Sequence, residues 1–219
     1  MYLFRPLAKR SKTGIAYNRS MDLISAKKTL NELYSGIDGF QISKDAIQKS
    51  PTFYAGMIYD EMTDDSFYEI LSKVNLPEGK VFIDLGSGVG KKVFLASLCF
   101  GFSPSIGLEL VPDLYTASQK VLSRYRQNPV KSGELNFIHT DYNDYDLSSG
   151  DVLFLSLTKA AMVIELTENL LHKLKCLKPG TIVITTGLPI VSPFYDLRDR
   201  QLCQFQTDEG EVFINLRID

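Results

Sequence analysis

The stretch that decides the fold is Asp84-Leu85-Gly86-Ser87-Gly88-Val89-Gly90. It follows the apolar run Val81-Phe82-Ile83 and leads into the apolar run Val93-Phe94-Leu95-Ala96. This order predicts a strand, a glycine turn and a helix. Glycine has no Cβ, so the backbone of such a turn can approach a ligand closely, and the free N–H groups of the next helix point at that ligand. The turn therefore predicts a site for a small nucleoside-containing cofactor.

From residue 80 onward, candidate strands alternate with candidate helices. Strands are expected at Lys80–Leu85, Ser105–Leu110, Leu135–Thr140, Asp151–Leu157 and Thr181–Thr186, and helices from Val89, from near Asp113 and from about Lys159 to Lys178. A βαβ series of this kind predicts a doubly wound, parallel sheet with a Rossmann-like α/β fold. Two further extended runs, Gln201–Thr207 and Glu211–Ile218, are joined by Asp208-Glu209-Gly210, which predicts a C-terminal antiparallel hairpin and seven strands in all.

Residues 1–50 differ in composition from the rest of the 219-residue chain. Residues 1–49 hold nine basic and four acidic side chains, whereas the remainder holds 15 basic and 22 acidic ones. We expect a basic, mainly helical N-terminal extension over residues 1–50 and the α/β domain over residues 51–219. Helices are predicted around Asp22–Tyr34, with Gly36, Gly39 and Pro51 marking the exit, and at residues 64–74. The basic extension can bind an acidic partner such as nucleic acid, or it can be a solvated helix.

The cysteines, the histidines and the hydropathy of the chain argue against a metalloprotein, a secreted protein and a membrane protein. Cys99 and Cys176 lie among apolar residues and are expected to be reduced core thiols, which indicates a reducing compartment. The cysteines and the isolated His139 and His172 lack metal-ligand spacing, so no metal site is expected. No apolar run approaches the ~20 residues that span a bilayer, and charge and proline soon interrupt the start of the chain. We therefore expect a cytoplasmic protein without a signal peptide or a membrane span; nothing indicates an oligomeric state.

Three cofactor types compete for the glycine turn. A P-loop requires G-x-x-x-x-G-K-[ST], but Leu85 and Lys92 occupy two of its fixed positions. A dinucleotide fingerprint requires G-x-G-x-x-G, but the third glycine comes one position early, at Gly90. An S-adenosylmethionine site requires D-x-G-x-G-x-G, and this chain matches every fixed position with Asp84, Gly86, Gly88 and Gly90. This cofactor has an ammonium, a carboxylate and a sulfonium in place of phosphates, so an acid at the turn suits it.

Acidic residues follow three successive strands. Asp84 ends the first, Glu109 ends the second and Asp141 follows the third. Because ligands of open α/β sheets bind at the carboxyl ends of the strands, we expect Glu109 to accept the ribose hydroxyls and Asp141 the adenine amino group, with Tyr142 covering the ring. Asp144 is a rival for the adenine role. Lys91 and Lys92 lie in the first helical turn, where the helix dipole disfavours cations. They either bind the cofactor carboxylate or a neighbouring acid, or extend into solvent.

With these residues in place, the chain resembles the class I S-adenosylmethionine-dependent methyltransferases over about residues 51–219. Within that class, Ile58-Tyr59-Asp60-Glu61-Met62-Thr63 and the glycine turn resemble the disruptor-of-telomeric-silencing family of lysine methyltransferases. The family has a Tyr-Gly-Glu loop that closes over the methionine part of the cofactor. The resemblance implies that Tyr59, Glu61 and Thr63 lie there, and that the turn and its neighbours, including Gly86, Ser87, Gly88 and Leu110, hold the rest.

The acceptor side departs from that family. Its paired asparagines after the fourth strand are replaced here by Ser156-Leu157-Thr158, and the stretch Val152–Leu155 with the following helix is also similar to the lysine methyltransferases of the ATP synthase c subunit. The resemblance implies methyl transfer to a protein lysine, with Ser156 and Tyr59 near the amine. Tyr59, Phe67, Phe154 and Leu157 are candidates for a dry channel wall or for core. Alternatives are an RNA or small-molecule methyltransferase and a non-catalytic interaction module.

Overall fold

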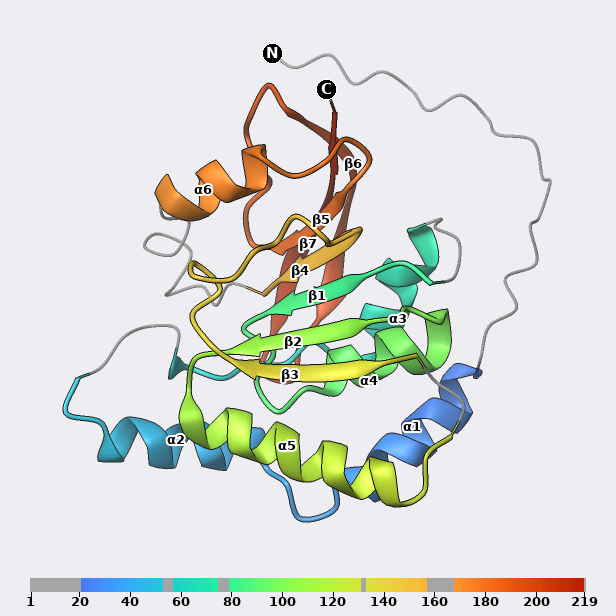
Figure 1. The fold of residues 1–219 in the computed structure, drawn as a ribbon, viewed down its shortest axis with the longest axis vertical. Helices are drawn as coiled ribbons and strands as arrows, with labels where there is room; N and C mark the ends of the chain where they lie inside the picture. Colours follow the sequence, from blue (N-terminus) through green and yellow to red (C-terminus); the bar gives the residue numbers. More distant parts are fainter. Residues whose placement is uncertain (1–20, 53–56, 75–78, 131–132, 157–167, 219) are drawn as a thin grey trace.

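A seven-stranded sheet forms the centre of the protein, in the order β3-β2-β1-β4-β5-β7-β6 (Figure 1). The computed structural model describes residues 21–52, 57–74, 79–130, 133–156 and 168–218. The strands are β1 Phe82–Leu85, β2 Ser105–Glu109, β3 Leu135–His139, β4 Val152–Leu155, β5 Ile182–Thr186, β6 Tyr195–Gln204 and β7 Glu209–Arg217. Strands β1 to β5 pair in parallel, and β7 runs antiparallel between β5 and β6. The predicted doubly wound sheet with a C-terminal antiparallel hairpin is confirmed.

Helices cover both faces of this sheet. They are α1 Leu23–Leu33, α2 Gly39–Lys49, α3 Asp64–Lys73, α4 Lys91–Phe100, α5 Pro112–Gln127 and α6 Glu168–Lys175. One apolar cluster joins α1 to α5 to the face that carries Phe82 and Phe154, whereas Leu170 and Leu174 of α6 pack on the other face, with Ile83. Neighbouring strand residues thus face different cores. Burial on both sides explains why β1 and β4 consist of uninterrupted apolar residues.

The helices next to the site begin with defined caps. Thr63 Oγ1 accepts a hydrogen bond from the Ser66 N–H (3.3 Å) at the start of α3. The N-cap of α4 is Gly90, in the left-handed region with φ 92°, so this helix begins two residues later than the predicted Val89. Its first N–H groups therefore emerge directly from the glycine turn, which positions them at the carboxyl edge of the sheet.

The N-terminal segment contains a second helix that the sequence analysis missed. Gly36 does break the chain, with φ 72°, but Gly39 is the first residue of α2. Asp38 caps that helix through a 3.0 Å hydrogen bond from the Gln41 N–H. Gly39 follows a good N-cap residue and begins a helix, so the prediction that it lies at the exit of a helix was wrong. Helix α1 packs against α3, α4 and α5, and α2 packs against α5.

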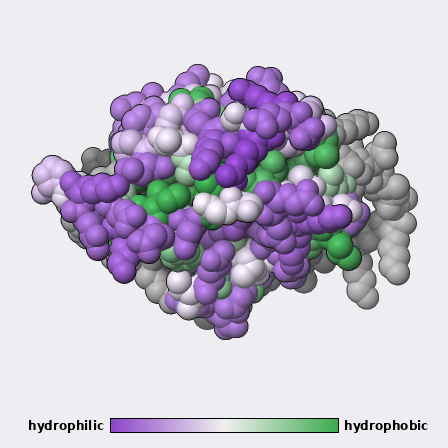
Figure 2. Space-filling view, turned by 90° about the horizontal axis from the view of Figure 1, so that it is seen from below, coloured by the Kyte–Doolittle hydropathy of each residue, from purple (hydrophilic) through white to green (hydrophobic). Residues whose placement is uncertain are grey.

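The outer face of these helices is mostly hydrophilic. Figure 2 views the molecule from the side of α1, α2 and α5 and shows hydrophobic areas only between larger hydrophilic ones. The sequence places five basic and no acidic residues in 1–20, but four of each in 21–49. The basic excess expected of the extension therefore lies outside the described residues, and residues 21–49 carry no net charge.

Two further expectations need correction, and a third is only partly covered by the described residues. The first hairpin strand begins at Tyr195, six residues before Gln201, and the turn occupies residues 205–208. The added residues are rich in charge, which an edge strand tolerates. Cys176 is exposed, so it is no core thiol, whereas Cys99 and Cys203 are buried. The helix expected from Lys159 is described only from Glu168, and its earlier part lies outside the described residues.

Candidate cofactor site

The three glycines of the turn have different surroundings. Gly86, Gly88 and Gly90 have φ values of 83°, 56° and 92°, a region that disfavours side chains. A Cβ on Gly88 would lie 2.3 Å from the Tyr59 ring, and one on Gly90 would lie 2.4 Å from the Phe137 ring. A Cβ on Gly86 would meet nothing within 4 Å. Gly88 and Gly90 therefore accommodate aromatic rings, and Gly86 is the position that a ligand can approach.

The turn is fixed to the end of β2. The N–H groups of Gly86 and Ser87 both donate to the Leu108 carbonyl at 2.9 Å. The buried Glu109 carboxylate accepts from the Gly88 N–H and the Val111 N–H, each at 2.7 Å. Burial raises the pKa of Glu109, and the N–H groups of Val111 and Gly88 oppose that rise. Each oxygen keeps a lone pair, so the carboxylate can still accept a hydrogen bond from a hydroxyl group.

Asp84 is buried in β1, opposite Gly107 of β2. Its carboxyl makes no side-chain hydrogen bond to any residue that the structure describes. Burial raises its pKa to about 8, Lys92 opposes this, and the charges of Glu109 and Glu61 add to it. A buried carboxyl of this kind is mostly protonated at neutral pH, and a cation that binds beside it would favour its ionised form.

The adenine-side candidates lie beyond β2 and β3. The Thr140 N–H donates to the Glu109 carbonyl at 3.1 Å, which holds the segment after β3 beside the end of β2. Asp141 is half-buried, and its Oδ1 accepts from the Asn143 N–H at 2.8 Å, whereas Asp144 is exposed. Tyr142 packs partly buried against the second core cluster. Leu110 is exposed directly after β2.

The loop before α3 covers the glycine turn. Tyr59 places its ring over Gly88 and against Gly39 of α2, and it makes an edge contact with Phe40, with ring centroids 5.2 Å apart. Burial, followed by the charge of Glu61, raises the pKa of Tyr59 well above its usual value, so the phenol stays neutral. The structure thus brings Tyr59 to the turn from a loop that the sequence alone could place there only by resemblance.

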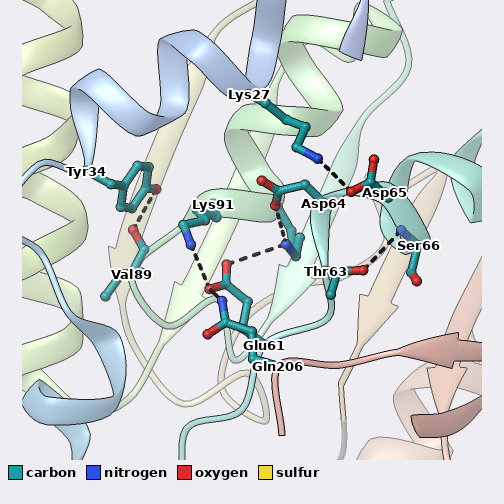
Figure 3. A network of polar contacts seen from close by, with 11 residues as sticks. Lys27, Tyr34, Glu61, Thr63, Asp64, Asp65, Ser66, Val89, Lys91 and Gln206 are labelled. Carbon is teal, nitrogen blue, oxygen red and sulfur yellow. Dashed lines mark hydrogen bonds and ion pairs between the residues drawn. The ribbon is translucent and has the colours of Figure 1, made fainter. Parts of the chain in front are cut away.

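Glu61 is the centre of a buried charge network (Figure 3). Its Oε2 lies 2.9 Å from Lys91 Nζ and accepts from Gln206 Nε2 at 3.1 Å. Lys92 Nζ lies 3.4 Å from Oε1 and 2.8 Å from Asp64 Oδ1. The Glu61 side chain is 8% exposed, and its Oε1 has no hydrogen-bond partner among the described residues. The expectation that both lysines extend into solvent is wrong, because the neighbouring acids bind them.

Two contributions to the site had no local signal in the sequence. Tyr34, at the end of α1, is buried and donates its hydroxyl to the Val89 carbonyl in the glycine turn at 2.9 Å (Figure 3). Gln206 comes from the turn between β6 and β7. Both lie far from residues 84–90 in sequence, so only the tertiary structure identifies them.

The remaining residues predicted for the cofactor site or the lysine channel lie in different environments. Thr63 uses its hydroxyl to cap α3. Ser87 Oγ is buried, has no hydrogen-bond partner within the described ranges and lies against Gly107. Ser156 is half-buried directly after β4. Phe67 and Phe154 are core residues, with ring centroids 5.2 Å apart, so they do not form a channel wall; Leu157 lies outside the described residues.

Comparison with known proteins identifies the family. The profile described as "Histone methylation protein DOT1" matches residues 44–207. The chain belongs to the DOT1 family. The resemblance noted in the Tyr59 loop and the glycine turn is confirmed by this match, which includes both of them and extends through β6.

Two DOT1 relatives are just over a quarter identical to this chain across the aligned residues. A Caenorhabditis elegans histone-lysine N-methyltransferase, specific for lysine-79 of histone H3, is 28% identical over 139 residues, 58% of this chain and 14% of that protein. A Yarrowia lipolytica protein of the same name is 27% identical over 165 residues, 71% of this chain and 32% of its own length. The chain thus spans less than a third of either relative.

Solved structures support the fold of this DOT1-family chain. An RNA methyltransferase from Salinibacter ruber in complex with S-adenosyl-L-homocysteine has a TM-score of 0.54 at 20% identity, over 72% of this chain and 94% of its own. A mutant of MtNAS in complex with S-adenosylmethionine has a TM-score of 0.55 at 16% identity, over 94% of this chain and 87% of its own. At these identities the likeness establishes a shared Rossmann-like architecture.

Neither a metal site nor a membrane span is present among the described residues. They hold no group of three or more His, Cys, Asp or Glu side chains that could bind a metal ion. The helices within the same ranges are all too short or too polar to cross a membrane.

Proposed function

We propose that this chain binds S-adenosylmethionine and transfers its methyl group to a protein lysine. The observation that carries the proposal is the Glu61–Lys91 pair beside the glycine turn, in a chain of the DOT1 family. The amino-acid end of the cofactor is a zwitterion and needs an anion for its ammonium and a cation for its carboxylate. Glu61 Oε1 is buried without a hydrogen bond among the described residues, and Lys91 Nζ lies 2.9 Å from the other oxygen, Oε2. This pairing of charges fits the methionine end and leaves no role for a phosphate.

Each part of the site suits one part of that cofactor. Glu109, at the end of β2, would accept the ribose hydroxyls. Leu110, Asp141 and Tyr142 would border the adenine. The methionine end would lie among Tyr59, Glu61, Thr63 and Asp84 and over the backbone of the turn, at Gly86, Ser87, Gly88 and Gly90. When bound, the cofactor supplies a methyl group already activated by its sulfonium.

The chain itself must supply a neutral, oriented amine. Lysine has a reference pKa of ~10.4, and an apolar environment lowers it by disfavouring the charged form. Ser156 stands at the end of β4, where its hydroxyl would orient the amine, and the neutral phenol of Tyr59 would border it. The paired asparagines of the family are absent at Ser156-Leu157-Thr158. We therefore propose that the methyl acceptor is a lysine of a protein. Histones are one member of that class of substrate.

Partner and compartment depend on the acceptor. The five basic side chains of residues 1–20 would favour contact with nucleic acid, as a chromatin substrate requires. A histone substrate in a nucleated cell would place the protein in the nucleus, whereas another protein substrate fits the cytoplasmic location expected from the sequence. Imaging of the tagged full chain distinguishes the two locations.

Two measurements test the proposed function. Calorimetry should show binding of S-adenosylmethionine and S-adenosylhomocysteine to the folded protein, and Gly86→Val should abolish it. Incubation of the protein with methyl-labelled cofactor and cell lysate should leave label that protease releases and nuclease does not. No heat with either ligand would refute the proposal, and nuclease-sensitive label would favour an RNA methyltransferase. Binding without any transfer would favour a non-catalytic module.

A further inference from the structure

The segment that carries Glu61 is paired with the turn between β6 and β7. The Thr63 N–H donates to the Gln204 carbonyl, and the Gln206 N–H donates to the Glu61 carbonyl, each at 2.9 Å. Met62 and Phe205, both buried, form an antiparallel bridge between these two hydrogen bonds. Main-chain bonds therefore fix the backbone of Glu61 against a turn that is more than 140 residues away in sequence.

The side chain of Gln206 makes a second, separate contact. Its Nε2 donates to Glu61 Oε2 at 3.1 Å, on the oxygen that also binds Lys91 Nζ at 2.9 Å (Figure 3). The opposite oxygen, Oε1, lies 3.4 Å from Lys92 Nζ and has no hydrogen bond to any residue that the structure describes. Two donors on one oxygen fix the plane of the carboxylate and leave the other oxygen available.

We infer that Gln206 is a positioning residue for cofactor binding, which orients the Glu61 carboxylate so that Oε1 receives the ammonium of the cofactor. The inference rests on the proposed function. Without the Gln206 donor, the two lysines alone would hold the carboxylate, and it could rotate until both oxygens were paired with them. The backbone would keep its place, because the Gln206 N–H and the Thr63 N–H bonds do not involve this side chain.

This role predicts an effect that depends on the ligand. S-adenosylhomocysteine has the amino-acid group that Glu61 would bind, whereas methylthioadenosine has the same nucleoside and thioether without ammonium or carboxylate. Loss of the Gln206 donor should weaken the first ligand and leave the second unchanged. A general loosening of the glycine turn would weaken both.

The test compares two glutamine-to-methionine variants of the full chain. Gln206→Met keeps the length of the side chain and removes its donor. Gln201→Met is the matched control, because Gln201 lies on the same hairpin and bonds to Lys73 of α3, away from Glu61. Affinities for both ligands come from calorimetry, and the melting temperature without ligand reports on folding.

We expect Gln206→Met to weaken S-adenosylhomocysteine roughly 3- to 10-fold, the range for one hydrogen bond to a charged group at a partly exposed position. Methylthioadenosine should bind as in the wild type, and both variants should melt within a few degrees of each other. Unchanged affinity for S-adenosylhomocysteine in Gln206→Met, or an equal loss for both ligands, would overturn the inference. Failure of the wild type to bind S-adenosylhomocysteine would instead refute the proposed function.

Discussion

The glycine turn and the Glu61 loop lie at the same edge of the sheet but are held there in different ways. Residues 84–90 are fixed by their own strand and by β2, through the Leu108 carbonyl and the Glu109 carboxylate. The loop from Tyr59 to Thr63 is fixed by Gln204 and Gln206, from the other end of the chain. One half of the site is therefore a local motif, and the other half is assembled by tertiary structure.

This difference separates folding from ligand recognition. Substitutions in the turn should affect the fold as well as binding, because the turn is part of the core. Substitutions in the charge network of the loop should affect mainly the amino-acid end of the ligand. Each of the following variants tests whether effects on folding and effects on ligand binding separate in this way.

The largest expected effect is that of Gly90→Ala. The new Cβ would lie 2.4 Å from the Phe137 ring at a φ of 92°, so overpacking and backbone strain combine to a loss of about 2–5 kcal/mol in the free energy of unfolding. Gly86→Ala is the matched control, since it has a similar φ but open space, and should lose only about 1–2 kcal/mol. Urea denaturation measures both losses. Equal losses would show that the Phe137 contact has no structural role.

The next effect is that of Glu109→Ala. It leaves the N–H groups of Gly88 and Val111 without their buried acceptor, which should cost about 2–4 kcal/mol in unfolding free energy and should abolish measurable binding of S-adenosylhomocysteine. Glu134→Ala, at an exposed glutamate, is the control. A variant as stable as the wild type would mean that Glu109 does not fix the turn.

A smaller effect concerns the pH dependence of Asp84. Because burial raises its pKa from 3.8 to about 8, the folded state holds a proton that the unfolded state releases in this range. Its contribution to stability is therefore lost as pH rises from about 4 to about 8. Asp84→Asn removes this loss, so the variant should gain stability relative to the wild type as pH rises from 5 to 9. Urea denaturation at several pH values measures the difference. A difference that does not change with pH would contradict the buried, protonated state.

The smallest effect on folding is expected for Lys91→Met in the loop network. The largely buried ion pair with Glu61 should contribute only about 0.5–1 kcal/mol to folding, because Lys92 and Gln206 remain on the carboxylate. S-adenosylhomocysteine should bind roughly 10-fold more weakly and methylthioadenosine unchanged, since only the former has a carboxylate. Lys120→Met, at an exposed lysine of α5, is the control in calorimetry. Equal weakening of both ligands would remove Lys91 from the amino-acid end of the site.

The sequence predicted the local half of the site well. The strand, the turn and the helix around residues 84–90 follow from glycine conformations and apolar runs that lie next to one another in the chain. Glu109 could be placed beside the turn because parallel strands end at a common edge. The start of α2 was missed because Gly39 can be read as a stop as well as a helix start, and only its contact with Tyr59 shows why glycine is required.

The other half could be predicted only by resemblance, because its partners are distant in sequence. Lys91 and Lys92 oppose the dipole of their own helix, and the compensating acids are Glu61, in the loop before α3, and Asp64, the first residue of α3, 28 or more residues earlier. Gln206 is an exposed glutamine in a hairpin turn, and its type and spacing give no sign of its bond to Glu61. The beginning of β6 was missed because an edge strand with one solvent face needs few apolar residues.

The ring of Tyr59 touches two glycines that serve different purposes. Gly88 needs its left-handed backbone, but Gly39 lies in the first turn of α2, where any side chain would fit the backbone and only the ring, 2.6 Å from a Cβ, forbids one. The identities of positions 39 and 59 should therefore be coupled. A substitution that shortens the aromatic residue at 59 should make larger residues acceptable at 39, whereas a chain that keeps the ring needs the glycine.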